Sequence, residues 1–169
     1  GVTAVSIGAE TGITLAQTIK SLGIKIPPEW ILFDTGATMD LFKNPAMVTD
    51  IRPADHEMVV SCNAGRRSTR MIAELPGYGT VWYDPDAIAN ILSLKGVKSR
   101  GRVQYDSESG HSFIVTKPDG TVLRFRESEE GLHYLDTTTQ NGFAMITTVA
   151  DNMSSYTRQD YLRAELARN

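Results

Sequence analysis

Residues 30–36 are the most informative stretch of the chain, and they read Trp30-Ile31-Leu32-Phe33-Asp34-Thr35-Gly36. Bulky apolar residues precede the aspartate directly, and Pro27-Pro28 lies just before them, which predicts a short buried strand. Such a strand ends by delivering a carboxylate onto a glycine turn. Because glycine has no side chain, backbone amides can approach that carboxylate closely.

Short β-strands are predicted on the C-terminal side of this stretch. Residues 57–61 and 68–74 flank a turn-rich centre at 63–66, which is typical of a hairpin. Pro118-Asp119-Gly120 is a strong turn signal between two further strands. The other expected strands cover 79–83, 102–106, 112–117 and 121–126, and residues 87–95 are expected to form a strand that runs into a short helix ending near Gly101. The middle of the chain is therefore predicted to be all-β.

The two ends differ in character from this middle part. The spacing of apolar residues over 13–22 predicts a helix that Gly23 ends, and a second helix is expected from Thr157 to the C-terminus. We expect residues 1–28 to be an N-terminal linker, 29–126 the main domain and 127–169 a partly helical tail. The chain begins with Gly1 and carries no initiator methionine, so we expect it to be a piece of a longer polypeptide.

Composition excludes several classes of protein. The chain has 169 residues, of which 41% are hydrophobic and 22% charged, and these values are typical of a globular domain. A net charge of −3 argues against a dedicated nucleic-acid-binding surface or a polybasic membrane anchor. The one cysteine, Cys62, excludes a disulfide scaffold. No apolar run is long enough to span a membrane, and the three histidines have no metal-ligand spacing, so no metal site is expected.

A carboxylate on a glycine turn is the arrangement that aspartic proteases use. Their chemistry needs two carboxylates a few ångströms apart, which share one proton because both cannot ionise together. The deprotonated member activates a water, and the protonated member donates to the scissile carbonyl oxygen. This chain has one Asp-Thr-Gly, and its other aspartates lack the flanking pattern. If Asp34 is catalytic, a second copy of the chain must supply the partner, which predicts a two-fold dimer.

The ordered set of motifs resembles the protease segment of a Ty1/copia-type long-terminal-repeat retrotransposon polyprotein, particularly of the algal and diatom branch. The resemblance extends from about residue 29 to the C-terminus. The motifs that carry it are Trp30 to Thr38, Leu75-Pro76-Gly77-Tyr78-Gly79-Thr80-Val81-Trp82-Tyr83, Asp86 to Leu94, Pro118-Asp119-Gly120-Thr121 and Gly131-Leu132-His133-Tyr134-Leu135-Asp136.

The resemblance implies a retropepsin-like closed barrel with a flap hairpin and one short helix. It implies that Asp34 is the catalytic aspartate and that Thr35 and Gly36 complete the catalytic loop. The substrate-binding residues implied are Ala37, Gly65 near the tip of the flap, and Ile91 and Leu92. The last two are followed by Ser93 where retropepsins carry glycine, as is usual in copia-type elements.

The implied activity is endopeptidase cleavage of the retroelement's own polyprotein by a homodimer, in the cytoplasm within retroelement particles. No cofactor is implied, because water is the attacking group. Segment 127–169 resembles the start of the pre-integrase region. The zinc-binding cluster expected further downstream is absent from the sequence, so no integrase function is expected.

Simpler readings stand beside these expectations. Asp34-Thr35-Gly36 can be an ordinary strand-end turn, and Gly65 can lie on a surface hairpin with no ligand. The basic clusters at 66–67 and 95–102 are better explained as a solvated face than as a nucleic-acid contact. A catalytically inactive module that serves assembly or nucleic-acid interaction is the alternative function. A third reading is an immature precursor whose flanking segments block dimer formation.

Overall fold

The structure is a computed structural model, and it describes residues 2–6, 15–62 and 65–139. Its elements are β1 (Val2–Ser6), α1 (Leu15–Leu22), β2 (Trp30–Asp34), β3 (Leu41–Phe42), the 3₁₀ helix η2 (Pro45–Met47), β4 (Thr49–Cys62), β5 (Gly65–Leu75), β6 (Gly79–Tyr83), β7 (Asn90–Ser93), α2 (Leu94–Arg100), β8 (Arg102–Asp106), β9 (Ser112–Thr116), β10 (Val122–Glu127) and β11 (His133–Asp136). Within these ranges no helix has the length and apolar character needed to cross a membrane.

The expected elements between residues 15 and 126 are confirmed, with small shifts at their ends. The hairpin is longer than predicted, because β4 and β5 extend over Thr49–Cys62 and Gly65–Leu75. Gly23 follows α1 with a φ of 66°, a conformation that glycine adopts without strain. The helix expected from Thr157 lies outside the described residues. The strands β1, β3 and β11 were not expected from the sequence.

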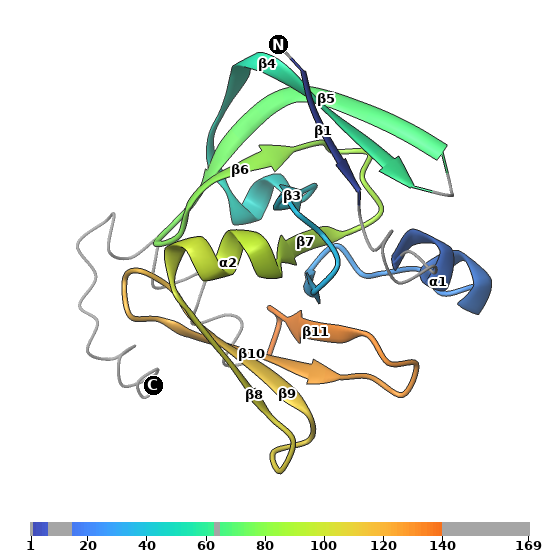
Figure 1. The fold of residues 1–169 in the computed structure, drawn as a ribbon, viewed down its shortest axis with the longest axis vertical. Coiled ribbons are helices and arrows are strands. Elements are labelled where there is room, and N and C mark those ends of the chain that lie inside the picture. Colours follow the sequence, from blue (N-terminus) through green and yellow to red (C-terminus); the bar gives the residue numbers. More distant parts are fainter. Residues whose placement is uncertain (1, 7–14, 63–64, 140–169) are drawn as a thin grey trace.

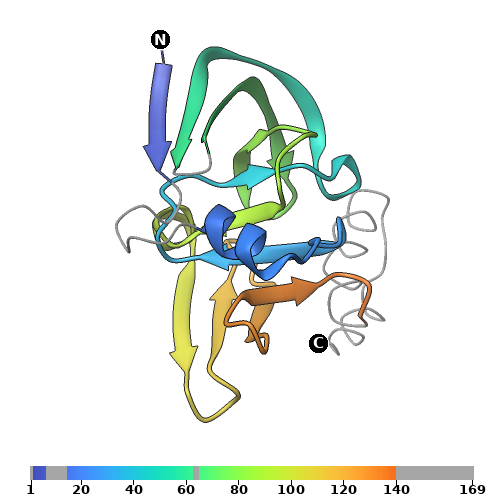
Figure 2. The same ribbon diagram turned by 90° about the vertical axis from the view of Figure 1, so that its right-hand side faces the viewer.

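The fold is predominantly β, and its described strands form one continuous, strongly bent sheet (Figures 1 and 2). The strand order is β1-β4-β5-β6-β3-β7-β2-β11-β10-β9-β8. The hairpin β4–β5 and β6 lie at one end of the molecule, and β8, β9 and β10 lie at the other (Figure 1). The strands β3, β7, β2 and β11 join these two ends.

The expectation of a closed barrel is wrong, because the sheet is open. Closure would require the first and last strands of the order, β1 and β8, to pair with each other. Instead β1 pairs with β4, and β8 pairs with β9. The apolar interior is covered in another way, since α2 places the fully buried side chain of Val97 in the main core cluster.

The strand β2 is buried on both of its faces. Ile31 and Phe33 belong to the main core, together with Phe42, Leu92 and Phe125. Leu32, on the opposite face, packs with Ile19 of α1, Ala37 and Ile91 in a second cluster. This arrangement explains why the strand reads as a continuous apolar run rather than an alternating one. Figure 2 shows α1 lying over β2.

The sheet continues beyond residue 126. The strand β11 pairs antiparallel with β2 from Trp30↔Asp136 to Phe33↔His133. Trp30 stacks on Tyr134 with ring centroids 4.2 Å apart. Thr137 donates its backbone N–H and its hydroxyl to the carbonyl of Glu29. Residues 133–136, which the sequence placed in the tail, are therefore part of the same sheet as β2, and residues 140–169 lie outside the described ranges.

One buried amide fixes β7 against the segments beside it. Asn90 is fully buried, and its Oδ1 accepts the backbone N–H groups of Lys43 and Asn44 at 2.8 and 2.9 Å. Its Nδ2 donates to the carbonyls of Pro28 and Trp30 at 3.0 and 2.8 Å. All four hydrogen-bonding positions of the amide are thus used, which sets the position of β7 relative to the start of β2.

We predict that Asn90→Ala lowers the free energy of unfolding by about 2–4 kcal/mol, because buried backbone groups lose their partners. The comparison variant is Asn44→Ala, which removes the N-cap of η2 and one hydrogen bond to the Pro28 carbonyl from a half-buried side chain, and it should cost only about 1 kcal/mol. Urea unfolding of both variants measures the difference. Equal losses would contradict the central role given to Asn90.

Candidate functional site

The Asp34 carboxylate lies at the C-terminal end of β2, where the chain leaves the sheet. Its Oδ1 accepts the backbone N–H of Gly36 at 2.9 Å, and its carbonyl accepts the N–H of Ala37 at 3.3 Å. The residue is 9% exposed. The turn therefore holds the carboxylate by a short local bond, and the small residue at position 36 permits that approach.

The structure brings Asp34 next to the end of β7. The strands β2 and β7 are parallel, and Asp34 is the register partner of Ser93. The carboxyl ends of these two parallel strands thus lie side by side, which in open α/β sheets is where ligand-binding residues come together. Two segments nearly sixty residues apart in sequence form this edge.

The remaining predicted residues fall into two groups. Thr35 is exposed, whereas Gly36 and Ala37 are buried. Ile91 and Leu92 are completely buried, one in each of the two core clusters that flank β2. Ile91 shares its cluster with Ala37 of the Asp34 turn, and Leu92 lies in the main core on the other face of the sheet. Gly65 is the first residue of β5 and pairs with Cys62 across the hairpin.

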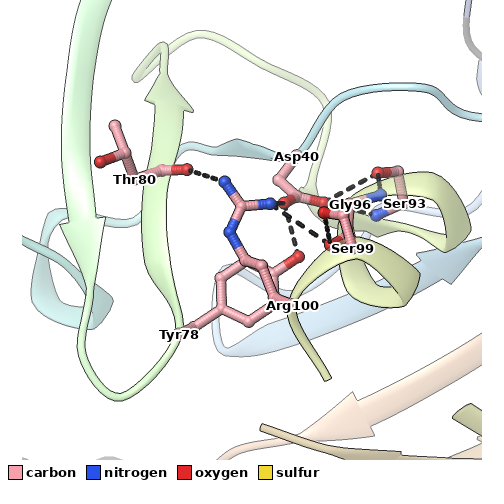
Figure 3. Close-up of polar contacts among 7 residues, drawn as sticks. All are labelled: Asp40, Tyr78, Thr80, Ser93, Gly96, Ser99 and Arg100. Atoms are coloured by element: carbon pink, nitrogen blue, oxygen red, sulfur yellow. Dashed lines mark hydrogen bonds and ion pairs between the residues drawn. The ribbon is translucent and has the colours of Figure 1, made fainter. Parts of the chain in front are cut away.

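A second buried carboxylate, that of Asp40, lies beside the same edge (Figure 3). Its Oδ1 accepts the backbone N–H and the hydroxyl of Ser93 at 2.8 and 2.9 Å. Its Oδ2 accepts the hydroxyl of Tyr78 at 2.6 Å and lies 3.5 Å from Nη1 of Arg100. Asp40 therefore connects the end of β7, the turn before β6 and the end of α2.

Ser93 has two roles in this network. Its hydroxyl donates to Asp40, and its oxygen accepts the backbone N–H of Gly96 at 2.9 Å, which caps the start of α2. A Cβ at position 96 would lie 2.5–2.8 Å from the Asp40 carboxylate, so only glycine leaves room for it. A serine at position 93 thus has a structural explanation in this chain.

Arg100 completes the network from the last turn of α2. Its Nη2 donates to the carbonyl of Thr80 at 3.1 Å, and its guanidinium carbon lies 4.8 Å from the centre of the Tyr78 ring (Figure 3). The sequence placed Arg100 in a solvated basic cluster. In the structure it is a half-buried internal partner, and its charge offsets that of Asp40.

Sequence reasoning missed the role of Asp40, because Asp40 lacks the motif that marks Asp34. Tyr78, Ser93 and Arg100 lie 38, 53 and 60 residues from Asp40 in the chain. No local pattern connects positions so far apart. Two of these partners lie inside quoted motifs, but nothing in the motifs pairs them with an acid.

The electrostatics of the network follow from its burial. Burial raises the pKa of the Asp40 carboxyl above its usual 3.8, although hydrogen bonds from Ser93 and Tyr78 and the charge of Arg100 oppose the rise. Burial and the neighbouring Asp40 charge also raise the pKa of the Tyr78 hydroxyl above 10. Tyr78 therefore stays protonated and acts as a donor at neutral pH.

Comparisons with known proteins find no counterpart for this chain: no family model, no curated protein and no solved structure matches it. What the chain does is therefore inferred from its own residues and their geometry.

We predict a pH signature for Asp40. A carboxyl whose pKa is higher in the folded chain binds its proton more tightly there, so its contribution to stability is greatest below pH 3.8 and is lost as the pH rises through the raised folded-state pKa. Asp40→Asn cannot titrate. The free energy of unfolding of the wild type relative to this variant should therefore fall as the pH rises through that window, measured by urea unfolding at a series of pH values.

The control for this measurement is Asp55→Asn. A hydrogen bond from His56 lowers the pKa of Asp55, so the contribution of Asp55 is present above pH 3.8 and is lost as the pH falls through its folded-state pKa. The two variants should thus differ from the wild type with opposite pH trends. A wild-type advantage over Asp40→Asn that stays constant with pH would exclude titration of Asp40 in this window.

Proposed function

We propose that this chain is an aspartic endopeptidase of the retropepsin-like kind, which cleaves a retrotransposon polyprotein. In this proposal a dyad of one Asp34 from each of two chains activates the attacking water. The observation that carries the proposal is the position of the Asp34 carboxylate, held by the Gly36 N–H at the end of a strand that is buried on both faces.

The immediate setting of the carboxylate supports this assignment. Ile91 is completely buried in the same core cluster as Ala37, so the residues that follow Asp34 pack against a rigid core. Thr35 is exposed beside it and is available to contact a second copy of the same loop. A dyad needs such a rigid loop, because two carboxylates must stay within a few ångströms to share a proton.

The other buried acids of the described residues support a two-chain site. Both oxygens of Asp40 accept hydrogen bonds from Ser93 and Tyr78, and the carboxylate is offset by Arg100. Asp84 accepts the backbone N–H of Asp86 within a turn. Because these acids hold internal structure, the second catalytic carboxylate is assigned to another copy of the chain.

The proposed chemistry is a direct attack of water on the peptide carbonyl. The water oxygen bonds to the carbonyl carbon while the ionised member of the dyad takes a proton from that water. The protonated member of the dyad donates its proton to the carbonyl oxygen. Collapse of the tetrahedral intermediate breaks the carbon–nitrogen bond. The leaving amine takes the proton that the first carboxylate received from the water, and the second carboxylate takes a hydroxyl proton from the intermediate, which restores the dyad. No acyl-enzyme forms, because the nucleophile is not a side chain.

The hairpin β4–β5 supplies the element that would cover a bound peptide. The hairpin lies beside β6 at one end of the molecule (Figure 1), and β4 and β5 are the two longest strands described. An extended peptide is recognised by main-chain hydrogen bonds to such a strand, with pockets for alternate side chains.

We predict that Asp34→Asn abolishes cleavage of a peptide that spans a junction of the parent polyprotein. The amide cannot serve as the general base, and the substitution keeps the shape of the side chain. The loss should be at least about a thousandfold in kcat/KM, with an unchanged urea midpoint. Asp86→Asn, an exposed aspartate, is the matched control and should keep full activity. Peptidase activity retained by Asp34→Asn would overturn the proposal.

We further predict a distinctive result for mixtures of wild type and Asp34→Asn. If each site needs one aspartate from each chain, an equilibrated equal mixture should retain about a quarter of the activity of wild type at the same total concentration, because only dimers with two intact chains act. A site within one chain would retain about half. Titrating the mixing ratio at fixed total protein distinguishes these two curves.

A further inference from the structure

The end of the hairpin strand β4 is paired on both sides. On one side it pairs antiparallel with β5, from Met58↔Thr69 to Cys62↔Gly65. On the other side it pairs in parallel with β1, from Val2↔Glu57 to Ser6↔Ser61. Figure 2 shows β1 running alongside the end of β4. The N-terminal strand is thus an added strand on the outer edge of the hairpin.

The strand that receives β1 is also held from its other side. The antiparallel ladder with β5 continues through residues 58–62, and Met58 is 1% exposed in a cluster with Leu41 and Trp82. β4 is therefore anchored to the rest of the sheet from its other side. β1 is the first strand of the order, and among the described strands β4 is its one neighbour in the sheet. Without β1, residues 57–61 would form a sheet edge with unpaired backbone groups, which is a template for another strand.

The sequence of β1 suits this role. Val2-Thr3-Ala4-Val5-Ser6 is uncharged, and three of its residues are β-branched, so it has high strand propensity and no charge that would oppose docking. Pairing of this kind depends mainly on main-chain hydrogen bonds, so other extended, uncharged peptides can form it.

We propose that residues 57–61 of β4 are a strand-addition site for an extended, uncharged peptide, and that β1 is its intramolecular occupant. A role of this site in catalysis rests on the proposed function. In that case the hairpin would cover the substrate, and β1 would compete with the substrate for residues 57–61. Residues 2–6 would then act as a built-in competitive inhibitor of peptide docking.

Tethering makes β1 a strong competitor. A segment attached to the same chain acts at an effective concentration on the order of 1 mM, so a free peptide reaches the edge of the wild-type chain only with difficulty. Weakening β1 should therefore raise the apparent affinity for free peptide without any change in β4 itself.

The test uses the full chain with Thr3→Pro and Ala4→Pro together. Alternate residues of a strand face its neighbour, so two successive prolines remove a backbone N–H whichever residues face β4. The probe is a fluorescein-labelled peptide with the sequence of residues 1–6. It should bind the proline variant at least about tenfold more tightly than the wild type, and it should slow amide exchange at residues 57–61. A labelled peptide with prolines at the same two positions should not bind.

Thr3→Val with Ala4→Val is the matched control chain, because it keeps strand propensity and should behave as the wild type. Unchanged exchange in β2 and β7 shows that the proline variant is folded. On the wild type itself, a nitroxide on the N-terminal amine should broaden the amide resonance of Glu57, which tests β1 docking without any substitution. Equal peptide affinity for wild type and proline variant, or absence of that broadening, would overturn the inference.

Docking is also measured in chains that carry Asp34→Asn, so its result does not depend on cleavage. A chain that cleaves its junction peptide but shows no docking at residues 57–61 overturns this inference and leaves the proposed function standing. A chain that docks the peptide but never cleaves overturns the proposed function and leaves the strand-addition site.

Discussion

The buried carboxylate of Asp40 is the interaction on which the geometry of the candidate site depends. It accepts hydrogen bonds from Ser93 at the end of β7 and from Tyr78 before β6, and it faces Arg100 at the end of α2. Burying a charge costs free energy unless polar partners surround it, and here those partners come from three separate elements. Any movement of one element would leave a buried charge or donor unpaired, so the network holds all three in one arrangement.

This arrangement fixes the neighbour of Asp34. Ser93, which Asp40 holds by two hydrogen bonds, is the register partner of Asp34 in the parallel pair of β2 and β7. Asp40 thus supports the edge on which the proposed catalytic carboxylate lies, although no contact between the two acids is needed for that. The two aspartates, six positions apart in the sequence, have different tasks because one occupies a turn at the end of a strand and the other is enclosed by donors.

The open sheet gives the molecule edges that a closed barrel would lack. A sheet edge carries unpaired backbone groups and must be covered or used. At the hairpin the chain covers its edge with β1, a strand that lies about fifty residues earlier in the sequence. The same feature that protects the edge marks it as a place where an extended peptide can pair, and so connects the fold to the peptide-binding role proposed for it.

Local sequence alone determined most of the elements. The apolar run of β2 and the turn residues around the hairpin predicted their strands correctly, because burial pattern and turn chemistry are local properties. The tripeptide Asp34-Thr35-Gly36 predicted a turn that carries a carboxylate for the same reason. The short β3, which pairs through only a few residues, and β11, which lies beside β2 a hundred positions away, gave no such signal. Only the tertiary structure decided that the sheet stays open, that β1 adds to β4, and that Asp40 meets Tyr78, Ser93 and Arg100. Each of these outcomes depends on which distant segments come together. The spacing of apolar residues or a motif in one stretch of chain does not say which distant segment that stretch will contact.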